Sequence, residues 1–479
     1  MNSLMNILPS LNTALSKVSE LFLSPTAIII YVIVLIVILM VVVFVMYFRE
    51  KNYHENEIQI HLDYNAANSK KEENKVVNKA PIIINNGVQP TVVPTVDVKP
   101  CVEEKTESPE EDEVVPSKDG ASRFYMLTQI DKDVENYVTP EYNNDISLEE
   151  LCEQFRNFAC NKLRLYYDIT DIRRFIAGLS VTKLIILQGM SGTGKTSLAY
   201  AFGEFLNNKT VVVPIQPMWK ERTDMIGYYN EFTKKFNETT LLYKMYEANT
   251  NKNLYITVLD EMNIARVEYY FAEFLSLLEL PNPEGRNLDV VSDVWDNDPK
   301  LLNKGKLRLP INMWFIGTAN NDDSTFAISD KVYDRAMVLN LDKKAEVFEA
   351  PETPTLSLSS DHLADLFVKA QKEYSISERN MRRIKQIDDY LIDTFHITFG
   401  NRIMKQIKAY VPVVVACGGT ELEALDDILS RKVLRKLESK NPVYVRAQSD
   451  ALCNFLDDLF GTDKMSLCKE VIHNIEQNA

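Results

Sequence analysis

The stretch LIILQGMSGTGKTSLAYAFGEFL (184–206) decides how this chain folds. It begins with four apolar residues, 184–187, that are typical of a buried strand, and it ends in a helix-forming run. Between the two lies the pattern GxxxxGK[ST], which in a strand–loop–helix context indicates a loop that wraps around phosphate groups. This context disfavours a chance match in a flexible loop.

The residue types of this loop suit a nucleoside triphosphate. Glycines allow successive backbone N–H groups to turn toward phosphate oxygens, and the N-terminus of the following helix adds a positive dipole. Lys195 is expected to bind the β- and γ-phosphates, and the Thr196 hydroxyl is expected to bind Mg²⁺. The predicted nucleotide-binding residues are Gly189, Ser191, Gly192, Thr193, Gly194, Lys195, Thr196 and Ser197.

A second apolar segment, 254–259, ends in two adjacent acids, Asp260 and Glu261. Acids at the carboxyl end of a parallel strand can complete a Mg²⁺–triphosphate site. Asp260 is predicted to hold the metal, and Glu261 to activate the attacking water. A helix-capping role would explain one of the two acids but not both.

The spacing of apolar segments predicts the fold class. Strands that alternate with helical or loop segments favour an α/β fold, in which helices flank a five-stranded parallel sheet and ligands bind at the carboxyl ends of the strands. The predicted strands are 184–187, 211–215, 254–259, 313–318 and 336–341. Helical spacing follows at 361–375, 379–395, 401–412, 421–438 and beyond 447, which predicts a C-terminal helical lid.

Together these residues resemble the AAA+ superfamily, and within it the McrB/MoxR/dynein-related branch. The resemblance covers roughly 180–440 and is strongest in LDEMNIARVEYYFAEFLSLLE (259–279) and MWFIGTANNDDSTFAISDKVYDRAMVLNL (313–341). It implies that Asn320 is the sensor 1 residue that orients the water. It also implies that Arg335 is an arginine finger acting on the neighbouring subunit's nucleotide, and that Arg402 is the sensor 2 residue of the lid.

Each of these three roles has a simpler alternative. Asn320 could cap a turn, Arg335 could form a surface ion pair with Asp334 or Asp330, and Arg402 could be a solvated helix residue. Arg382 and Arg383 are the other candidates for sensor 2.

Two further segments depart from a generic P-loop domain. In related proteins a loop near 214–222 lines a central pore, so Trp219, Lys220 and Arg222 are candidates for contacting a partner. The alternative is that Trp219 packs beneath the insertion. The segment 281–309 is expected to form a loop with a hairpin, and its role is left open.

The resemblance also implies a working unit and a cofactor. An arginine finger supplied by a neighbour requires a homo-oligomeric ring, by resemblance a hexamer. Mg²⁺ and ATP are the expected ligands. GTP is disfavoured because McrB-type GTP preference accompanies an MNxxDR motif, whereas the corresponding stretch here is ANNDDS (319–324).

The composition restricts the partners. With a net charge of −15, this chain is expected to bind DNA only weakly or indirectly, because phosphate contacts need clustered Lys and Arg. No PD-(D/E)xK or HNH nuclease motif is recognisable. The resemblance implies that the function is that of an McrB-like motor subunit, in a restriction or anti-phage system whose nuclease is a separate chain. A MoxR-like chaperone that remodels proteins is the alternative, and the full set of catalytic residues disfavours a non-hydrolysing scaffold.

Residues 27–48 form an uncharged apolar stretch of 22 residues. A helix of this length spans about 33 Å, close to the hydrocarbon thickness of a bilayer. Lys17 precedes the stretch, whereas Arg49 and Lys51 follow it. These charges predict a single-pass membrane protein with a cytoplasmic ATPase domain.

The linker that follows is rich in polar residues and ends in the acidic run EEKTESPEEDE (103–113), which predicts a disordered tether. The predicted organisation is a short N-terminal segment (1–26), a transmembrane helix (27–48), a disordered acidic linker (49–120), a small helical segment (121–180), an α/β nucleotide-binding domain (181–342), a connector (343–360) and a helical lid with C-terminal helices (361–479).

Overall fold

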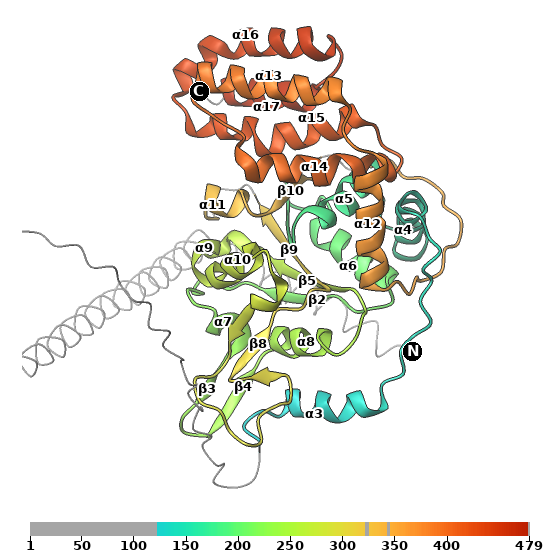
Figure 1. Cartoon of the computed structure of the whole chain (residues 1–479), viewed down its shortest axis with the longest axis vertical. Coiled ribbons are helices and arrows are strands. Elements are labelled where there is room, and N and C mark those ends of the chain that lie inside the picture. Colours follow the sequence, from blue (N-terminus) through green and yellow to red (C-terminus); the bar gives the residue numbers. More distant parts are fainter. Residues whose placement is uncertain (1–121, 321–324, 343–344, 478–479) are drawn as a thin grey trace, which may run out of the picture. The chain divides into compact units, whose positions relative to one another are not determined.

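The computed structural model describes residues 122–320, 325–342 and 345–477 (Figure 1). The predicted segment 1–26, the predicted transmembrane helix 27–48 and the predicted linker 49–120 lie outside the described residues.

The centre of the fold is a parallel sheet of five strands in the order β10-β1-β9-β5-β2. Its strands are β1 (Leu184–Gly189), β2 (Val211–Pro214), β5 (Tyr255–Asp260), β9 (Met313–Asn320) and β10 (Met337–Asn340). The predicted α/β fold with a five-stranded parallel sheet is confirmed, and most strand ends differ from the prediction by one or two residues.

The register of the sheet gathers the polar strand ends. Gly189 of β1 is paired with Asn320 of β9, and Leu259, which precedes Asp260, is paired with Gly317 of β9. The carboxyl ends of parallel strands share one edge of a sheet. The predicted phosphate loop, the two acids and Asn320 therefore emerge side by side.

Alternate residues of the strands point into two separate cores, as the period of a strand requires. Ile185 and Leu187 pack under α4 (Leu148–Leu163), α5 (Ile169–Val181) and α6 (Lys195–Phe205). Leu184 and Ile186 face the opposite core. The helices of that second core include α3 (Met126–Asp133), α7 (Thr223–Ile226), α8 (Thr240–Ala248), α9 (Val267–Tyr270), α10 (Ala272–Glu279) and α11 (Asp330–Tyr333).

Aromatic side chains fill the first core. Phe155 of α4 contacts Phe175 of α5 and both Phe202 and Phe205 of α6, with ring centroids 5.0–6.4 Å apart. All four rings are fully buried, and burial of such a side chain stabilises a fold by roughly 1.5–3 kcal/mol. The helix that starts at the phosphate loop is thereby fixed to the rest of the domain.

Two insertions extend from the sheet domain. One is the hairpin of β3 (Gly227–Asn230) and β4 (Lys235–Glu238). The other is an antiparallel sheet in the order β6-β8-β7, with strands β6 (Asn287–Asp289), β7 (Leu302–Asn303) and β8 (Lys306–Arg308). The segment 281–309, expected to hold a hairpin, thus forms three short strands.

The C-terminal helices make up the predicted lid, most of which lies above the sheet domain in Figure 1, while its first helix runs down beside that domain. It comprises α12 (Ser360–Glu373), α13 (Glu378–Phe395), α14 (Gly400–Ala416), α15 (Glu421–Lys432), η4 (Leu434–Ser439), α16 (Pro442–Phe460) and α17 (Ser466–Gln477). Helix α14 continues past Pro412, where the sequence predicts an end. Buried Val411, Val413 and Val414 hold this turn in the core, and their packing outweighs the hydrogen bond that proline removes.

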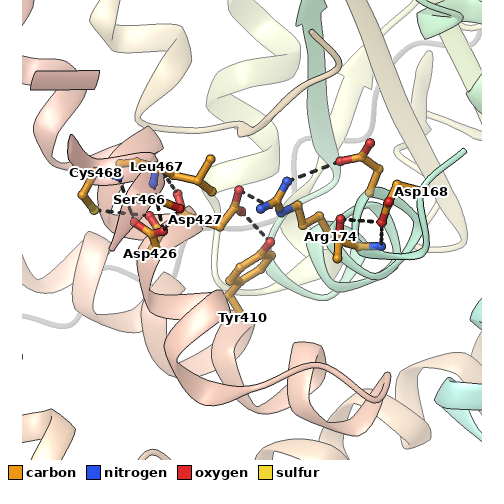
Figure 2. A network of polar contacts seen from close by, with 11 residues as sticks. Asp168, Arg174, Tyr410, Asp426, Asp427, Ser466, Leu467 and Cys468 are labelled. Atoms are coloured by element: carbon orange, nitrogen blue, oxygen red, sulfur yellow. Dashed lines mark hydrogen bonds and ion pairs between the residues drawn. The ribbon is translucent and has the colours of Figure 1, made fainter. Parts of the chain in front are cut away.

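A polar network joins the sheet domain to the lid (Figure 2). Arg174 of α5 contacts Asp171 at 3.3 Å and Asp427 of α15 at 3.2 Å. Asp427 also accepts a 2.6 Å hydrogen bond from the hydroxyl of Tyr410 on α14. The neighbouring Asp426 accepts from the backbone N–H groups of the first turn of α17, at 2.9 and 2.8 Å. Such a carboxylate satisfies helix N–H groups that have no intrahelical partner.

We expect Asp171 to make stability depend on pH. Burial, together with the nearby Asp168 and Asp427, raises the pKa of Asp171 to about 6, and Arg174, which is shared with Asp427, only partly offsets this. The folded protein therefore holds this proton more tightly than the unfolded chain, and its stability falls as the pH rises from about 4 to about 6. Denaturant unfolding across this pH range measures the fall in the free energy of unfolding. In Asp171→Asn this fall should be smaller than in the wild type by up to roughly 3 kcal/mol. Equal slopes for wild type and variant would contradict the prediction, and exposed Asp365→Asn is the control.

The predicted single-pass membrane localisation requires correction. Within 122–477, as far as the structure describes it, every helix is too short or too polar to cross a bilayer. The prediction came from 27–48, which lies outside the described part of the chain.

Candidate functional site

The predicted phosphate loop connects β1 directly to α6. Gly189 has φ +142°, and a Cβ there would lie 2.5 Å from the carbonyl oxygen of Leu341. Gly194 has φ +88° and precedes the first residue of α6, and a Cβ there would lie 3.2 Å from the Tyr167 hydroxyl. Both positions therefore require glycine. The Tyr167 hydroxyl also donates a 3.0 Å hydrogen bond to the carbonyl of Gly194, a contact that the sequence did not predict.

Lys195 lies across this loop. Its side chain is buried, and Nζ donates hydrogen bonds to the carbonyl oxygens of Gly189 at 2.9 Å and Met190 at 2.8 Å. The amine is thus held inside the curve of the loop. A phosphate bound to the loop N–H groups would meet its positive charge there.

Thr196 and Asp260, both predicted Mg²⁺ ligands, are in contact. The Thr196 hydroxyl donates to Asp260 Oδ1 at 2.8 Å, and the Thr318 hydroxyl of β9 donates to the same oxygen at 2.9 Å. A hydroxyl and a carboxylate side by side are oxygen donors of the kind that Mg²⁺ prefers. These residues therefore fit the predicted metal.

Glu261 leaves the strand in a left-handed conformation, with φ 51° and ψ 47°. Its backbone N–H donates to the Thr318 hydroxyl at 2.9 Å, which fixes the turn, while its side chain is exposed. Left-handed backbone is uncommon outside glycine and concentrates at functional sites. The two adjacent acids therefore point to different surroundings: Asp260 into the hydroxyl pair, and Glu261 toward solvent.

Asn320 ends β9 next to Gly189, and Asn263 holds it there. The Asn263 side-chain amide donates to the carbonyl of Asn320 at 2.9 Å, to the Thr325 hydroxyl at 3.0 Å and to the carbonyl of Phe326 at 3.2 Å. Asn263 is buried. We missed it in the sequence, although it stands in the strongest stretch of the resemblance, two residues after Glu261.

The structure brings Arg335 and Arg402 to the same acid, Glu279 at the end of α10. Arg335 Nη2 lies 2.8 Å from one carboxylate oxygen, and Arg402 Nη2 lies 2.6 Å from the other. Arg335 is largely buried, with 16% of its side chain exposed, and its Nε and Nη1 have no hydrogen-bond acceptor among the described residues. Asp330 and Asp334, the alternative partners of Arg335, instead pair with Arg435 and Lys436.

Other candidate residues have structural partners. Trp219 packs against the second core, 6.0 Å from the Tyr270 ring, and Arg222 pairs with Glu273 at 2.8 Å. These contacts favour the packing alternative for Trp219. Arg383 donates to Asn380 within α13 and lies over the Phe460 ring, so it is held inside the lid.

A cavity of about 1040 Å³ lies between the sheet edge and the lid. Met190 of the phosphate loop and Asn320 line one side, and Arg431, Arg435 and Asn474 of the lid line the other. Neither Arg335 nor Arg402 is among the described residues that line it. Arg431, which no sequence pattern singled out, has a buried Nε without a hydrogen-bond acceptor in the described part of the chain.

Comparisons with known proteins agree with this geometry. The family described as AAA domain (dynein-related subfamily) matches residues 184–336, and a family described as a domain of unknown function, DUF8727, matches residues 356–479. The chain is also similar to the type IV methyl-directed restriction enzyme EcoKMcrB subunit of Escherichia coli (strain K12). The two are 27% identical over 173 residues, which is 35% of this chain and 36% of that protein.

Two solved structures show a weaker likeness. A putative ATPase from Cytophaga hutchinsonii aligns with 62% of this chain and 82% of its own, with a TM-score of 0.38 and 12% identity. A full-length MCM homolog from Methanopyrus kandleri aligns with 60% of this chain and 59% of its own, with a TM-score of 0.35 and 10% identity.

The family match covers the sheet from the start of β1 to the residue before β10, and it includes the phosphate loop, both acids, Asn320 and Arg335. Residues 184–336 therefore match an AAA domain of the dynein-related subfamily, and part of the chain is similar to an McrB subunit.

Proposed function

We propose that this chain binds ATP and Mg²⁺ at the carboxyl edge of the sheet and hydrolyses the ATP. The observation that carries the proposal is the convergence of Lys195, the Thr196–Asp260 hydrogen bond and Glu261 at one edge. The loop would bind the phosphates, and Thr196 and Asp260 would hold the metal. Bound Mg²⁺ offsets the charge of the β- and γ-phosphates.

The remaining residues would act on the attacking water. The exposed carboxylate of Glu261 would accept its proton, and Asn320, held by Asn263, would orient it. Asp260 Oδ1 accepts hydrogen bonds from the hydroxyls of Thr196 and Thr318, which hold this carboxylate beside the other proposed metal ligand. We therefore assign Asp260 to the metal and Glu261 to the water. We propose ATP over GTP because the stretch 319–324 lacks the arginine of the McrB-type motif.

We further propose that the working unit is a homo-oligomeric ring, hexameric by resemblance, in which Arg335 acts on the neighbouring subunit's ATP. Arg335 does not line the cavity beside its own phosphate loop, and it keeps two unpaired donors near Glu279. Buried donors without an acceptor are unfavourable, and an anion brought to them by a neighbouring subunit would satisfy them.

The biological role that we propose is a motor subunit, McrB-like, that drives a separate effector chain such as a nuclease. The Escherichia coli relative is named as a subunit of a methyl-directed restriction enzyme, and the present chain matches about a third of it. With a net charge of −15 we expect any contact with DNA to be weak or indirect. Stimulation of ATP turnover by a nuclease-like partner would support this role, and stimulation by a folded protein client alone would support the MoxR-like chaperone instead.

Nucleotide binding is tested by Lys195→Ala. Loss of the amine removes a charge-assisted contact to the phosphates, worth about 1.5–3 kcal/mol, so ATP affinity should fall about 10- to 100-fold. Isothermal titration calorimetry with Mg²⁺ and a non-hydrolysable ATP analogue measures the change. Lys209→Ala, at an exposed lysine beyond the other end of α6, should bind like the wild type. Wild-type affinity in Lys195→Ala, or no uptake by the wild type, would refute the proposed site.

A further inference from the structure

The short loop that carries Arg335 is held by the lid. The loop runs from α11 (Asp330–Tyr333) to β10, and Lys432, the last residue of α15, reaches it. Lys432 Nζ donates to the carbonyl oxygen of Tyr333 at 2.6 Å and also to that of Ala336. These two carbonyls flank Arg335 in the sequence, so a single buried amine spans the loop.

A second lid side chain binds the carbonyl between them. Gln406 of α14 donates from Nε2 to the carbonyl oxygen of Asp334 at 3.1 Å. Lys432 and Gln406 are both buried, with 4% and 7% of their surface exposed. Three of the four carbonyls of 333–336 are thereby bound by the lid, and the loop has little freedom to turn while the lid is in place.

Charged lid residues contact the same segment from its outer side. Arg435 lies 3.9 Å from the centre of the Tyr333 ring and 2.6 Å from Asp330. Lys436 lies 3.4 Å from the Asp334 carboxylate. These contacts are partly exposed and therefore weak individually, so the buried donors of Lys432 and Gln406 dominate the attachment.

We propose that Lys432 is a positioning residue for Arg335, through which the lid of one subunit sets the rate of ATP hydrolysis in the next. This inference rests on the proposed function, in which Arg335 acts between subunits. The direction of a side chain is set by its backbone, and a shift of about 1 Å in a catalytic group can cost about 100-fold in rate. A lid that moves with its own nucleotide would carry the Tyr333–Ala336 carbonyls with it.

Lys432 serves here as a hydrogen-bond donor and does not depend on its charge. Burial lowers its pKa to about 7, against the opposing effect of Asp334. A neutral amine still has two hydrogens, enough for the carbonyls of Tyr333 and Ala336. Methionine, which matches the length of lysine without its donors, is thus the informative replacement.

The test uses mixtures of full-length subunits. Lys432→Met alone should bind ATP within about threefold of the wild type but hydrolyse it about 100-fold more slowly. Mixed with Glu261→Gln subunits, which have an intact Arg335 but a defective site, it should regain activity. With random mixing at equal amounts, roughly a quarter of all sites would pair an intact site with an intact arginine.

The decisive mixture is Lys432→Met with Arg335→Ala. Both variants are expected to supply a defective arginine, so they should not restore each other's activity, whereas each should be restored by Glu261→Gln. Restoration of activity by Arg335→Ala would show that the defect of Lys432→Met lies in its own site, and it would overturn the inference. Unchanged activity of Lys432→Met alone would overturn it as well.

Two further variants keep the outcome clear. Gln406→Met removes the second buried donor and should behave as Lys432→Met does, more weakly, which covers the case in which Lys432→Met fails to fold. Lys405→Met, at an exposed lysine of the same helix, should be fully active. If Arg335→Ala and Glu261→Gln fail to restore each other while the wild type is active, the action of Arg335 between subunits is wrong, and the inference falls without affecting the ATPase assignment.

Discussion

Replacing Arg335 by alanine is expected to lower the rate of ATP hydrolysis by about 10³–10⁵, with ATP binding nearly unchanged. The guanidinium would stabilise charge on the transferring phosphoryl group, which develops after binding. Its Nε and Nη1 are buried and have no acceptor among the described residues, so a phosphate that reached them at a subunit interface would satisfy both donors. Steady-state phosphate release, with affinity measured separately by calorimetry, resolves the two effects.

The neighbouring arginine provides a comparison. Arg402 shares Glu279 with Arg335 but has 51% of its side chain exposed, so Arg402→Ala should have a smaller effect. Exposed Arg379 of α13 is the control for removal of a surface charge. Full activity of Arg335→Ala would leave its contact with Glu279 as a structural ion pair only, and the proposed action between subunits would be abandoned.

The second large effect is expected for Glu261→Gln, which should retain ATP binding but lose turnover by about 10²–10⁴. The amide cannot accept the proton of the attacking water, whereas the phosphate loop and the Thr196–Asp260 pair are unchanged. Single-turnover hydrolysis of labelled ATP, with bound nucleotide recovered on the protein, measures both quantities.

The fold should tolerate glutamine at position 261. The side chain is exposed and the turn is fixed by a backbone N–H, so glutamine should fold as glutamate does. Glu284→Gln, at an exposed acid of the insertion, should turn over like the wild type. Wild-type turnover by Glu261→Gln would mean that another group accepts the proton.

The sequence predicted the parts of the site that are local. Lys195 and Thr196 follow β1 within the phosphate-loop pattern, and Asp260 and Glu261 end an apolar strand. The order of strands then brings these segments together, because parallel strands share their carboxyl edge. The fold class could therefore be predicted from the pattern of apolar runs.

The contacts that were missed join distant segments. Glu279 meets Arg402 more than a hundred residues away, and Lys432 reaches Tyr333 across a comparable separation. Neither contact has a local pattern, since each depends on how the lid packs on the sheet domain. Trp219 was ambiguous for the same reason: a Trp in an insertion is a surface or a core residue depending on whether Tyr270 lies beneath it.

The contact between the first glycine of the phosphate loop and the end of β10 has a mechanical consequence. A Cβ at Gly189 would lie 2.5 Å from the Leu341 carbonyl oxygen, so the loop packs directly against the chain just after β10, which continues toward α12. A change in the curvature of the loop would push directly on that departing chain. If the loop binds ATP as proposed, a change in its shape on loss of the γ-phosphate would therefore reach Leu341, from which the chain continues toward the lid.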